Sequence, residues 1–404
     1  LVVVLCDLES IREVLINQED KDPDRLLSKK YGSVFSFYSF KQLVVVLCDL
    51  ESIREVLIKQ AEKVPDRPVS EIMRRVKRGN YGITFSKGPV WKEQRNFFIK
   101  QMRRLGFSKM CTEANINDEI WHLCAVLDQN ISKPYDPMIP LNNAVCNVIS
   151  QFMFGKRFQY DDPNFFKILT KSGSNATAFN VQLFTVTTWT VRLIPGLRQK
   201  LNKYIESRRE IFKYQKNLID EKRLAFVSSE EPQTYIDAFL KKQTEEYIQE
   251  FPETTYVDHQ LHMAVDEIFA AGTESTANTI RWAILFSMLN EEKQDCVHAE
   301  LDKVLQPGES LCLDDRGRLP YLEAFIQETQ RLGNLIPLLS SQTIQQVRVK
   351  NYILPSGTII LANPWSVSMN ENIFPNPEEF KPERFISEDG SFMHSEHNSF
   401  PFGL

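Results

Sequence analysis

The chain has 404 residues, of which 42% are hydrophobic and 25% are charged, and its formal net charge is −5. These values are typical of a globular protein with a sizeable core and argue against a disordered chain. Because the chain lacks the overall basic character of most nucleic-acid-binding proteins, we expect no nucleic-acid partner.

The cysteines and the apolar runs indicate the kind of environment to expect. Seven cysteines are scattered along the chain without a C-x-x-C pair, which predicts reduced thiols rather than a disulfide framework. The aliphatic opening Leu1–Leu5 is far shorter than the ~18 residues of a membrane-spanning helix. We therefore expect no membrane anchor in the sequence as given.

The N-terminal region repeats itself. The segment LVVVLCDLESIREVLI occurs at residues 1–16 and again at 43–58, and the copies aligned from Leu1 and Leu43 agree at 21 of 25 positions. Each copy joins a β-branched run to a helix-forming stretch, which predicts a buried strand leading into a short helix. No third copy follows, so we interpret the pair as a duplication and not as a solenoid.

Hydrophobic periodicity predicts the remaining elements in chain order. We expect neighbouring strands near the N-terminus, mostly helical segments through the middle with Gly155 as one helix stop, three further helices, and strands with a turn after Asn334. The ranges are strands over Gly32–Phe40 and Leu43–Asp49, helical segments from Val90 to about Arg223, and helices over Asp258–Leu289, Glu291–Leu305 and Tyr321–Leu332. One large, mainly helical domain with a β-rich lobe is the predicted architecture.

The helix expected over Asp258–Leu289 contains the segment FAAGTESTANT. Gly272 costs a helix about 1 kcal/mol relative to alanine, and the hydroxyls of Thr273, Ser275 and Thr276 can bond to backbone carbonyls. We therefore predict a kink here, with Glu274 beside it as a candidate proton source. A polar patch where the helix reaches the surface is the alternative.

Two further patterns concern charged side chains. Glu328 and Arg331 lie at i and i+3 on a predicted helix, a spacing that is most often a solvated surface pair. Arg384 stands in FKPERF, where a rigid loop would bury part of its charge and require a partner, for which Glu328 is the candidate.

Trp91 and Arg95 lie at i and i+4 in WKEQR, so one helical face offers an indole N–H and a guanidinium fork. Such a face suits an anion such as a carboxylate. The alternative is a core tryptophan beside a surface arginine.

The order and spacing of these motifs resemble the cytochrome P450 family of haem-thiolate monooxygenases, in its animal microsomal branch. The segments that carry the resemblance, from about Lys29 to Leu404, are YGSVFSFY, GITFSKGPVWKEQR, AAGTEST, LPYLEAFIQETQRLGNLIPL, FPNPEEFKPERF and FPFG. The resemblance implies a mainly α, multihelical fold with a small β-sheet lobe.

The resemblance also implies roles for the residues that match the family's motifs. The expected cofactor is haem, an iron protoporphyrin. Trp91 and Arg95 are expected to bind one of its propionates, and Ala271 and Gly272 to line it along the distal helix. Glu328, Arg331 and Arg384 are expected to form a buried charge network behind it. Glu274, Ser275 and Thr276 are the expected catalytic residues, which relay protons to bound dioxygen. Ser275 departs from the threonine of most relatives, and Ser341 and Gln342 stand where many relatives carry a histidine or arginine near a propionate.

Further expectations concern the substrate and the redox partner. The apolar pocket implied by the resemblance is lined by Phe85, Phe179, Leu183, Phe269, Ala270 and Leu338. Lys100, Arg103 and Arg104 resemble the basic face that docks an acidic flavoprotein reductase, although a solvated basic helix end would look the same.

The implied function is insertion of one oxygen atom into an apolar organic molecule, with electrons from NADPH passed on by the reductase. The implied location is the cytoplasmic face of the endoplasmic reticulum membrane, with membrane association expected for the intact protein. A non-catalytic remnant or gene-model fragment that keeps the helical scaffold is the alternative from another functional class.

The two ends of the chain depart from the family pattern. Residues 1–28, the duplicated strand–helix segment, occupy the stretch where relatives carry an apolar anchor, so we interpret them as an exon duplication or gene-model error and residues 29–404 as the family domain. The final FPFGL would open the loop that presents the axial cysteine, which is expected ~5 residues beyond Leu404. No metal ligand is therefore assigned, and the 404-residue chain is expected to bind haem poorly and to lack turnover.

Overall fold

The computed structural model describes residues 28, 30–39, 42–69, 79–106, 110–162, 165, 195–251 and 253–393. The chain divides into two compact units. Unit 1 takes the residues up to Pro68 and those from Trp282 onward, and unit 2 is Val69–Arg281. Residues 1–27, which hold the first copy of the repeat, lie outside the described residues, so the division into segment 1–28 and domain 29–404 stays a prediction.

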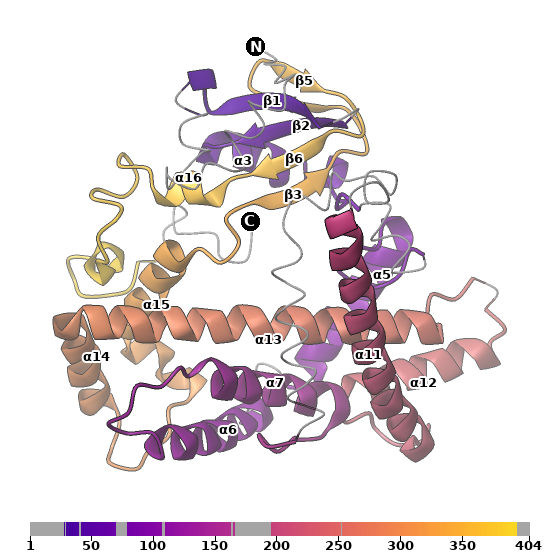
Figure 1. Cartoon of the computed structure of the whole chain (residues 1–404), viewed down its shortest axis with the longest axis horizontal. Helices are drawn as coiled ribbons and strands as arrows, with labels where there is room; N and C mark the ends of the chain where they lie inside the picture. The colour runs from indigo at the N-terminus through magenta and orange to yellow at the C-terminus, as the bar shows by residue number, and fades with distance from the viewer. Residues whose placement is uncertain are drawn as a thin grey trace. The chain divides into compact units, whose positions relative to one another are not determined.

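Unit 1 contains a four-stranded mixed sheet with the strand order β1-β2-β6-β3 (Figure 1). The strands are β1 (Val34–Ser39), β2 (Gln42–Leu47), β3 (Leu339–Gln342) and β6 (Ile359–Ala362). β1 and β2 are antiparallel, β2 and β6 are parallel, and β3 runs antiparallel to β6. The inner pair of strands therefore joins the beginning of the chain to a segment near its end.

The second copy of the repeat forms β2 and the helix α3 (Leu50–Leu57), as the sequence predicts. The valine run of β2 is buried because the strand has a neighbour on each edge and helical cover. Asp49 caps α3 by accepting the backbone N–H of Ser52 at 2.8 Å. Ile53 and Val56 of α3 belong to the same buried core as Val45 of β2, so the helix packs against the sheet.

The rest of unit 1 is a small hairpin and several helices. The elements are β4 (Val347–Val349) paired with β5 (Tyr352–Leu354), the helices α14 (Glu291–Val304), α15 (Pro320–Gly333) and α16 (Pro364–Ser368), and the 3₁₀ turns η1 (Ala61–Lys63), η2 (Leu313–Arg318) and η3 (Pro382–Phe385). The two helices predicted from periodicity, over Glu291–Leu305 and Tyr321–Leu332, are confirmed to within one residue at each end.

Unit 2 consists of helices joined by turns and loops, with no strand among its described residues. Its helices are α5 (Gly88–Arg104), α6 (Met110–Asp128), α7 (Met138–Phe154), α11 (Pro195–Ala225), α12 (Tyr235–Ile248) and the first part of α13 (Asp258–Leu289). Their apolar faces share one core that includes Met153, Ile219, Phe239 and Leu261. Gly155 ends α7 with φ of 68°, a left-handed conformation that glycine adopts without strain, which confirms the predicted stop.

The kink predicted near Gly272 is not present: α13 runs as one uninterrupted helix through that segment (Figure 1). The hydroxyls of Thr273 and Ser275 donate to the carbonyls of Phe269 and Ala271, at 2.8 and 2.7 Å, as expected. A carbonyl oxygen has two lone pairs, so it accepts the hydroxyl without giving up its helical N–H. Back-bonding here adds hydrogen bonds to the ladder and does not break it.

Gly272 has a packing role in this helix. A Cβ at this position would lie 2.9 Å from Cδ1 of Ile149, which belongs to α7. The missing side chain lets the Ile149 side chain lie against the backbone of α13. This explains a glycine in mid-helix without a bend, while its expected haem contact stays a prediction.

Candidate active site

The helix α5 presents Trp91 and Arg95 together. The Arg95 guanidinium carbon lies 5.7 Å from the centroid of the Trp91 ring, within cation–π range. Arg95 is exposed, and neither its guanidinium nor the indole N–H of Trp91 has a hydrogen-bond partner among the residues that the structure describes. On another face of α5, Gln94 is fully buried and donates to Thr255 at 2.7 Å, which fixes the helix. The pair is therefore a rigidly mounted set of donors that can bind an anion.

The basic end of α5 is only partly available. Arg104 donates to Glu231 at 2.8 Å and to Gln101 at 2.9 Å, so its charge is already paired. Lys100 and Arg103 are exposed and make no ion pair within the described part of the chain. The charge that remains for a partner is therefore carried by two of the three predicted residues.

The predicted catalytic segment of α13 lies partly at the surface of unit 2. Ala271, Ser275 and Thr276 are exposed, and Ala271 and Ser275 share a face at the i, i+4 spacing. The Ser275 hydroxyl donates to the Ala271 carbonyl, so it can serve as a relay only by rotating away from that carbonyl. The structure thus gives this face of the helix room for a bound group beside polar side chains.

Glu274 is the titratable group of this segment. Burial raises the pKa of its carboxyl above the usual 4.5, because a carboxylate loses solvation in a partly buried position. Its side chain has no hydrogen-bond or ion-pair partner among the described residues that would offset this effect. A half-buried carboxyl with a raised pKa keeps its proton to a higher pH than an exposed carboxyl, which suits a proton donor.

The predicted pocket residues do not all share the face of Ala271 and Ser275. Phe269 is buried in the core of unit 2, with its ring centroid 6.4 Å from that of Phe154, so it lies away from the exposed face of Ala271 and its pocket role stays a prediction. The reason is helical geometry: at about 100° per residue, Phe269 lies roughly 200° from Ala271. Ala270 is partly exposed on the same helix.

The other pocket predictions are dispersed. Phe85 is partly exposed in unit 2, and Leu338 is partly exposed in unit 1, directly before β3. Phe179 and Leu183 lie outside the described residues. Their common role in a pocket stays a prediction.

The segment before α5 is held by two side chains of α13 that the sequence reasoning missed. Glu267 accepts the backbone N–H groups of Ile83 and Thr84 at 2.6 and 2.7 Å. Gln260, seven residues earlier on α13, accepts the N–H of Gly82 at 2.8 Å and donates to its carbonyl at 3.1 Å. We call these contacts the 82–84 clamp; it fixes the backbone that leads to Phe85 and α5.

Gly82 is required by this clamp. Its φ is +97°, and a Cβ there would lie 2.5 Å from the carboxylate oxygens of Glu267. The sequence signal that could have shown the clamp is weak: a polar pair at i and i+7 in an otherwise apolar helix face, opposite a glycine far away in the chain.

In unit 1, Glu328 holds both predicted arginines. Its carboxylate pairs with Arg331 through two hydrogen bonds, at 2.6 and 2.8 Å, and with Nε of Arg384 at 3.0 Å. Glu328 and Arg331 are fully buried, so the solvated surface pair is excluded and the expected Glu328–Arg384 contact is confirmed. The backbone N–H of Lys381 and the carbonyl of Ser368 complete the network, at 2.8 Å from Glu328 and from Arg331.

A further arginine, distant in sequence, lies beside Ser341. The sequence itself has no basic residue at positions 341 and 342. Arg67, at the end of the second repeat copy, donates from one guanidinium nitrogen to the Ser340 carbonyl at 2.8 Å and to the Ser341 hydroxyl at 2.6 Å. Desolvation lowers the pKa of Arg67, but the side chain keeps part of its surface in solvent. It is a second candidate for binding an anion, in unit 1.

Nowhere in the described ranges do three or more histidine, cysteine, aspartate or glutamate side chains gather in a way that could hold a metal ion. Of the helices in those ranges, none combines the length and the apolar character that crossing a membrane requires.

Comparison with known proteins agrees with the motifs. The family model described as Cytochrome P450 matches residues 15–404. Similar relatives include Cytochrome P450 2D28 of Mesocricetus auratus (34% identical, covering 76% of this chain and 61% of the relative), Cytochrome P450 2J2 of Homo sapiens (32%, 92% and 73%) and Cytochrome P450 2U1 of Rattus norvegicus (33%, 100% and 68%). The chain thus spans less than two thirds of the first of these relatives. It belongs to the cytochrome P450 family, whose members are haem-dependent monooxygenases.

Proposed function

We propose that this chain is part of a monooxygenase that uses haem to insert one oxygen atom into an apolar small molecule, with electrons from NADPH delivered by a flavoprotein reductase. The observation that supports this most directly is the Trp91–Arg95 donor pair, which is rigidly mounted and without a protein partner among the described residues. A haem propionate is a carboxylate that such a pair fits.

Bound haem would supply the activation of dioxygen. Trp91 and Arg95 would fix a carboxylate of the cofactor through an N–H donor and a charged fork. Glu274, whose pKa is raised by burial, would supply a proton, and the Ser275 hydroxyl would pass that proton on after rotating away from the Ala271 carbonyl. Thr276 offers a second exposed hydroxyl beside it.

The proposed substrate is an apolar organic molecule, and the partly exposed side chains of Phe85 and Ala270 in unit 2 would offer it apolar contacts. Lys100 and Arg103 are proposed as the contact for an acidic reductase, with Arg104 removed from that set because Glu231 pairs with it. The endoplasmic reticulum membrane, on its cytoplasmic face, is the location that family membership supports.

The test is a reduced carbon-monoxide difference spectrum of the protein expressed from its complete transcript. A thiolate-type Soret band, together with oxygenated products from a panel of apolar compounds, is the expected result. A purified protein that binds no haem under these conditions would favour the non-catalytic alternative, which no described residue supports at present.

A further inference from the structure

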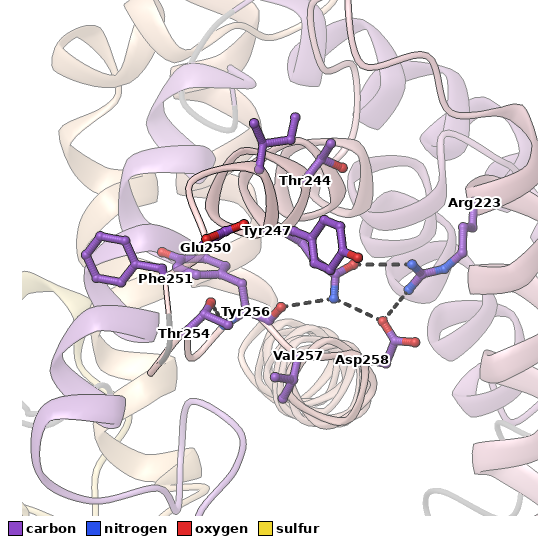
Figure 2. Close-up of a pocket in the computed structure, with 11 residues that line it drawn as sticks. Arg223, Thr244, Tyr247, Glu250, Phe251, Thr254, Tyr256, Val257 and Asp258 are labelled. Carbon is purple, nitrogen blue, oxygen red and sulfur yellow. Dashed lines mark hydrogen bonds and ion pairs between the residues drawn. The ribbon is translucent and has the colours of Figure 1, made fainter.

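Unit 2 carries a cavity of about 790 Å³ at its surface, where α11 and α12 end and α13 begins (Figure 2). Its volume is within the range of sites for small organic ligands. Asp258, the first residue of α13, lies 16 positions before Glu274, or ~24 Å along the helix axis. The cavity is therefore remote from the candidate catalytic segment.

Two carboxylates line the cavity, and one of them has no ion-pair partner among the described residues. Arg223 donates to Asp258 at 2.6 Å, and Gln243 donates to the same Asp258 oxygen at 3.0 Å, so these charges neutralise each other. Glu250 is exposed and makes no ion pair with any residue in the described part of the chain. In Figure 2 the paired charges lie at one end of the cavity and Glu250 lies toward the other, near Phe251.

Two exposed aromatic side chains line the same cavity. Tyr247 and Phe251 line the cavity with 83% and 59% of their surfaces exposed, which is unusual for large apolar side chains. A third ring, that of Tyr256, already receives a cation: Nζ of Lys242 lies 5.7 Å from its centroid. The rings of this region are therefore placed to take up cations through their faces.

The helix ends add to the same preference. Both α11 and α12 reach the cavity with their C-terminal ends, where the helix dipole carries partial negative charge. The electrostatic environment of the open part of the cavity favours a cation.

We infer that this cavity is an accessory binding site for organic cations that have an apolar body, such as alkyl- or arylammonium compounds. Glu250 supplies the counter-charge, and Tyr247 and Phe251 supply ring faces for the ammonium group and its substituents. This site is separate from the proposed monooxygenase site and does not depend on haem.

The experiment uses the full chain and two probes of equal shape, benzyltrimethylammonium and the uncharged neopentylbenzene, with binding followed by ligand-observed NMR. The cation should bind saturably and at least fivefold more tightly than the neutral probe. Tyr247→Ala and Glu250→Gln should each weaken binding of the cation about fivefold, a loss expected for one cation–π or one exposed charge contact. Both positions are exposed, so both variants should keep the native circular dichroism spectrum.

Glu245→Gln is the matched control, because Glu245 is an exposed carboxylate of α12 that does not line the cavity. It should bind the cation as the unchanged chain does. Equal binding of the two probes, or binding that is unaffected by both Tyr247→Ala and Glu250→Gln, would overturn the inference.

Discussion

The carboxylate of Glu267 accepts the backbone N–H of Ile83 at 2.6 Å, and the same oxygen accepts the N–H of Thr84. Glu267 is buried, so these hydrogen bonds are charge-assisted and shielded from water. The contact joins residues 184 positions apart. It fixes two of the three backbone positions of the 82–84 clamp, and Gln260 of the same helix holds the third, Gly82.

Replacing Glu267 should loosen that segment. Glu267→Ala removes the acceptor from two amides and should lower the free energy of unfolding by about 2–4 kcal/mol, while Glu267→Gln, which keeps a neutral acceptor, should cost about half of that. Amide hydrogen exchange at Ile83 and Thr84 should be faster in Glu267→Gln than in the native protein, and faster still in Glu267→Ala. Unchanged exchange at both amides in Glu267→Ala would show that the clamp does not hold this backbone.

The Glu328 network should be the most sensitive charged group in unit 1. Glu328→Ala leaves Arg331 and Arg384 buried without a counter-charge and should cost about 3–5 kcal/mol, measured as a fall in the midpoint of urea denaturation. Glu323→Gln on the same helix is the control, because Glu323 pairs with the exposed Arg316 and such pairs contribute about 0–1 kcal/mol. Equal losses in the two variants would contradict the assignment of a buried network.

Glu274 should destabilise the folded protein at neutral pH. Because its pKa is higher in the folded chain than in the unfolded chain, stability is lost as pH rises from about 4.5 through the folded-state pKa. Glu274→Gln removes that loss, so the gain in Tm over the native protein should be smallest at low pH and should grow toward pH 7. Glu245→Gln controls for the loss of one exposed carboxylate, and a gain that is independent of pH would argue against a raised pKa.

Arg95 should contribute to cofactor retention if the proposed function is correct. Arg95→Ala removes a charged fork and should raise the haem dissociation constant about ten- to a hundredfold, and Arg95→Lys should have a smaller effect because it keeps the charge. The exposed Lys92 of the same helix gives the control Lys92→Ala. Haem transfer to apomyoglobin measures the change, and equal retention by the Arg95 and Lys92 variants would remove Arg95 from the site.

Local patterns predicted the elements of this fold well. The helix expected over Asp258–Leu289 has those bounds, and the valine run of the second repeat copy forms the buried β2. The Glu328–Arg384 pair was also predictable, because an arginine in a proline-bounded loop needs a buried partner. In each case the cause lies in a few neighbouring residues or in one unsatisfied charge.

Contacts between distant segments were not predictable in the same way. The close packing at Gly272 of α13 involves Ile149 of another helix, and the clamp on Gly82 depends on Glu267. The position of Arg67 beside Ser341 likewise depends on strand pairing. Each requires knowing which surfaces meet, and a single sequence without related sequences does not carry that information.

The parallel pairing of β2 with β6 has a consequence for synthesis on the ribosome. About 310 residues separate Leu47 from Ile359, so at the usual elongation rates β2 waits roughly 15 to 60 seconds for its partner strand. Unit 2 is one continuous stretch and emerges completely in that interval. The nascent chain must therefore keep the apolar edge of β2 from pairing with other chains until β6 has been made.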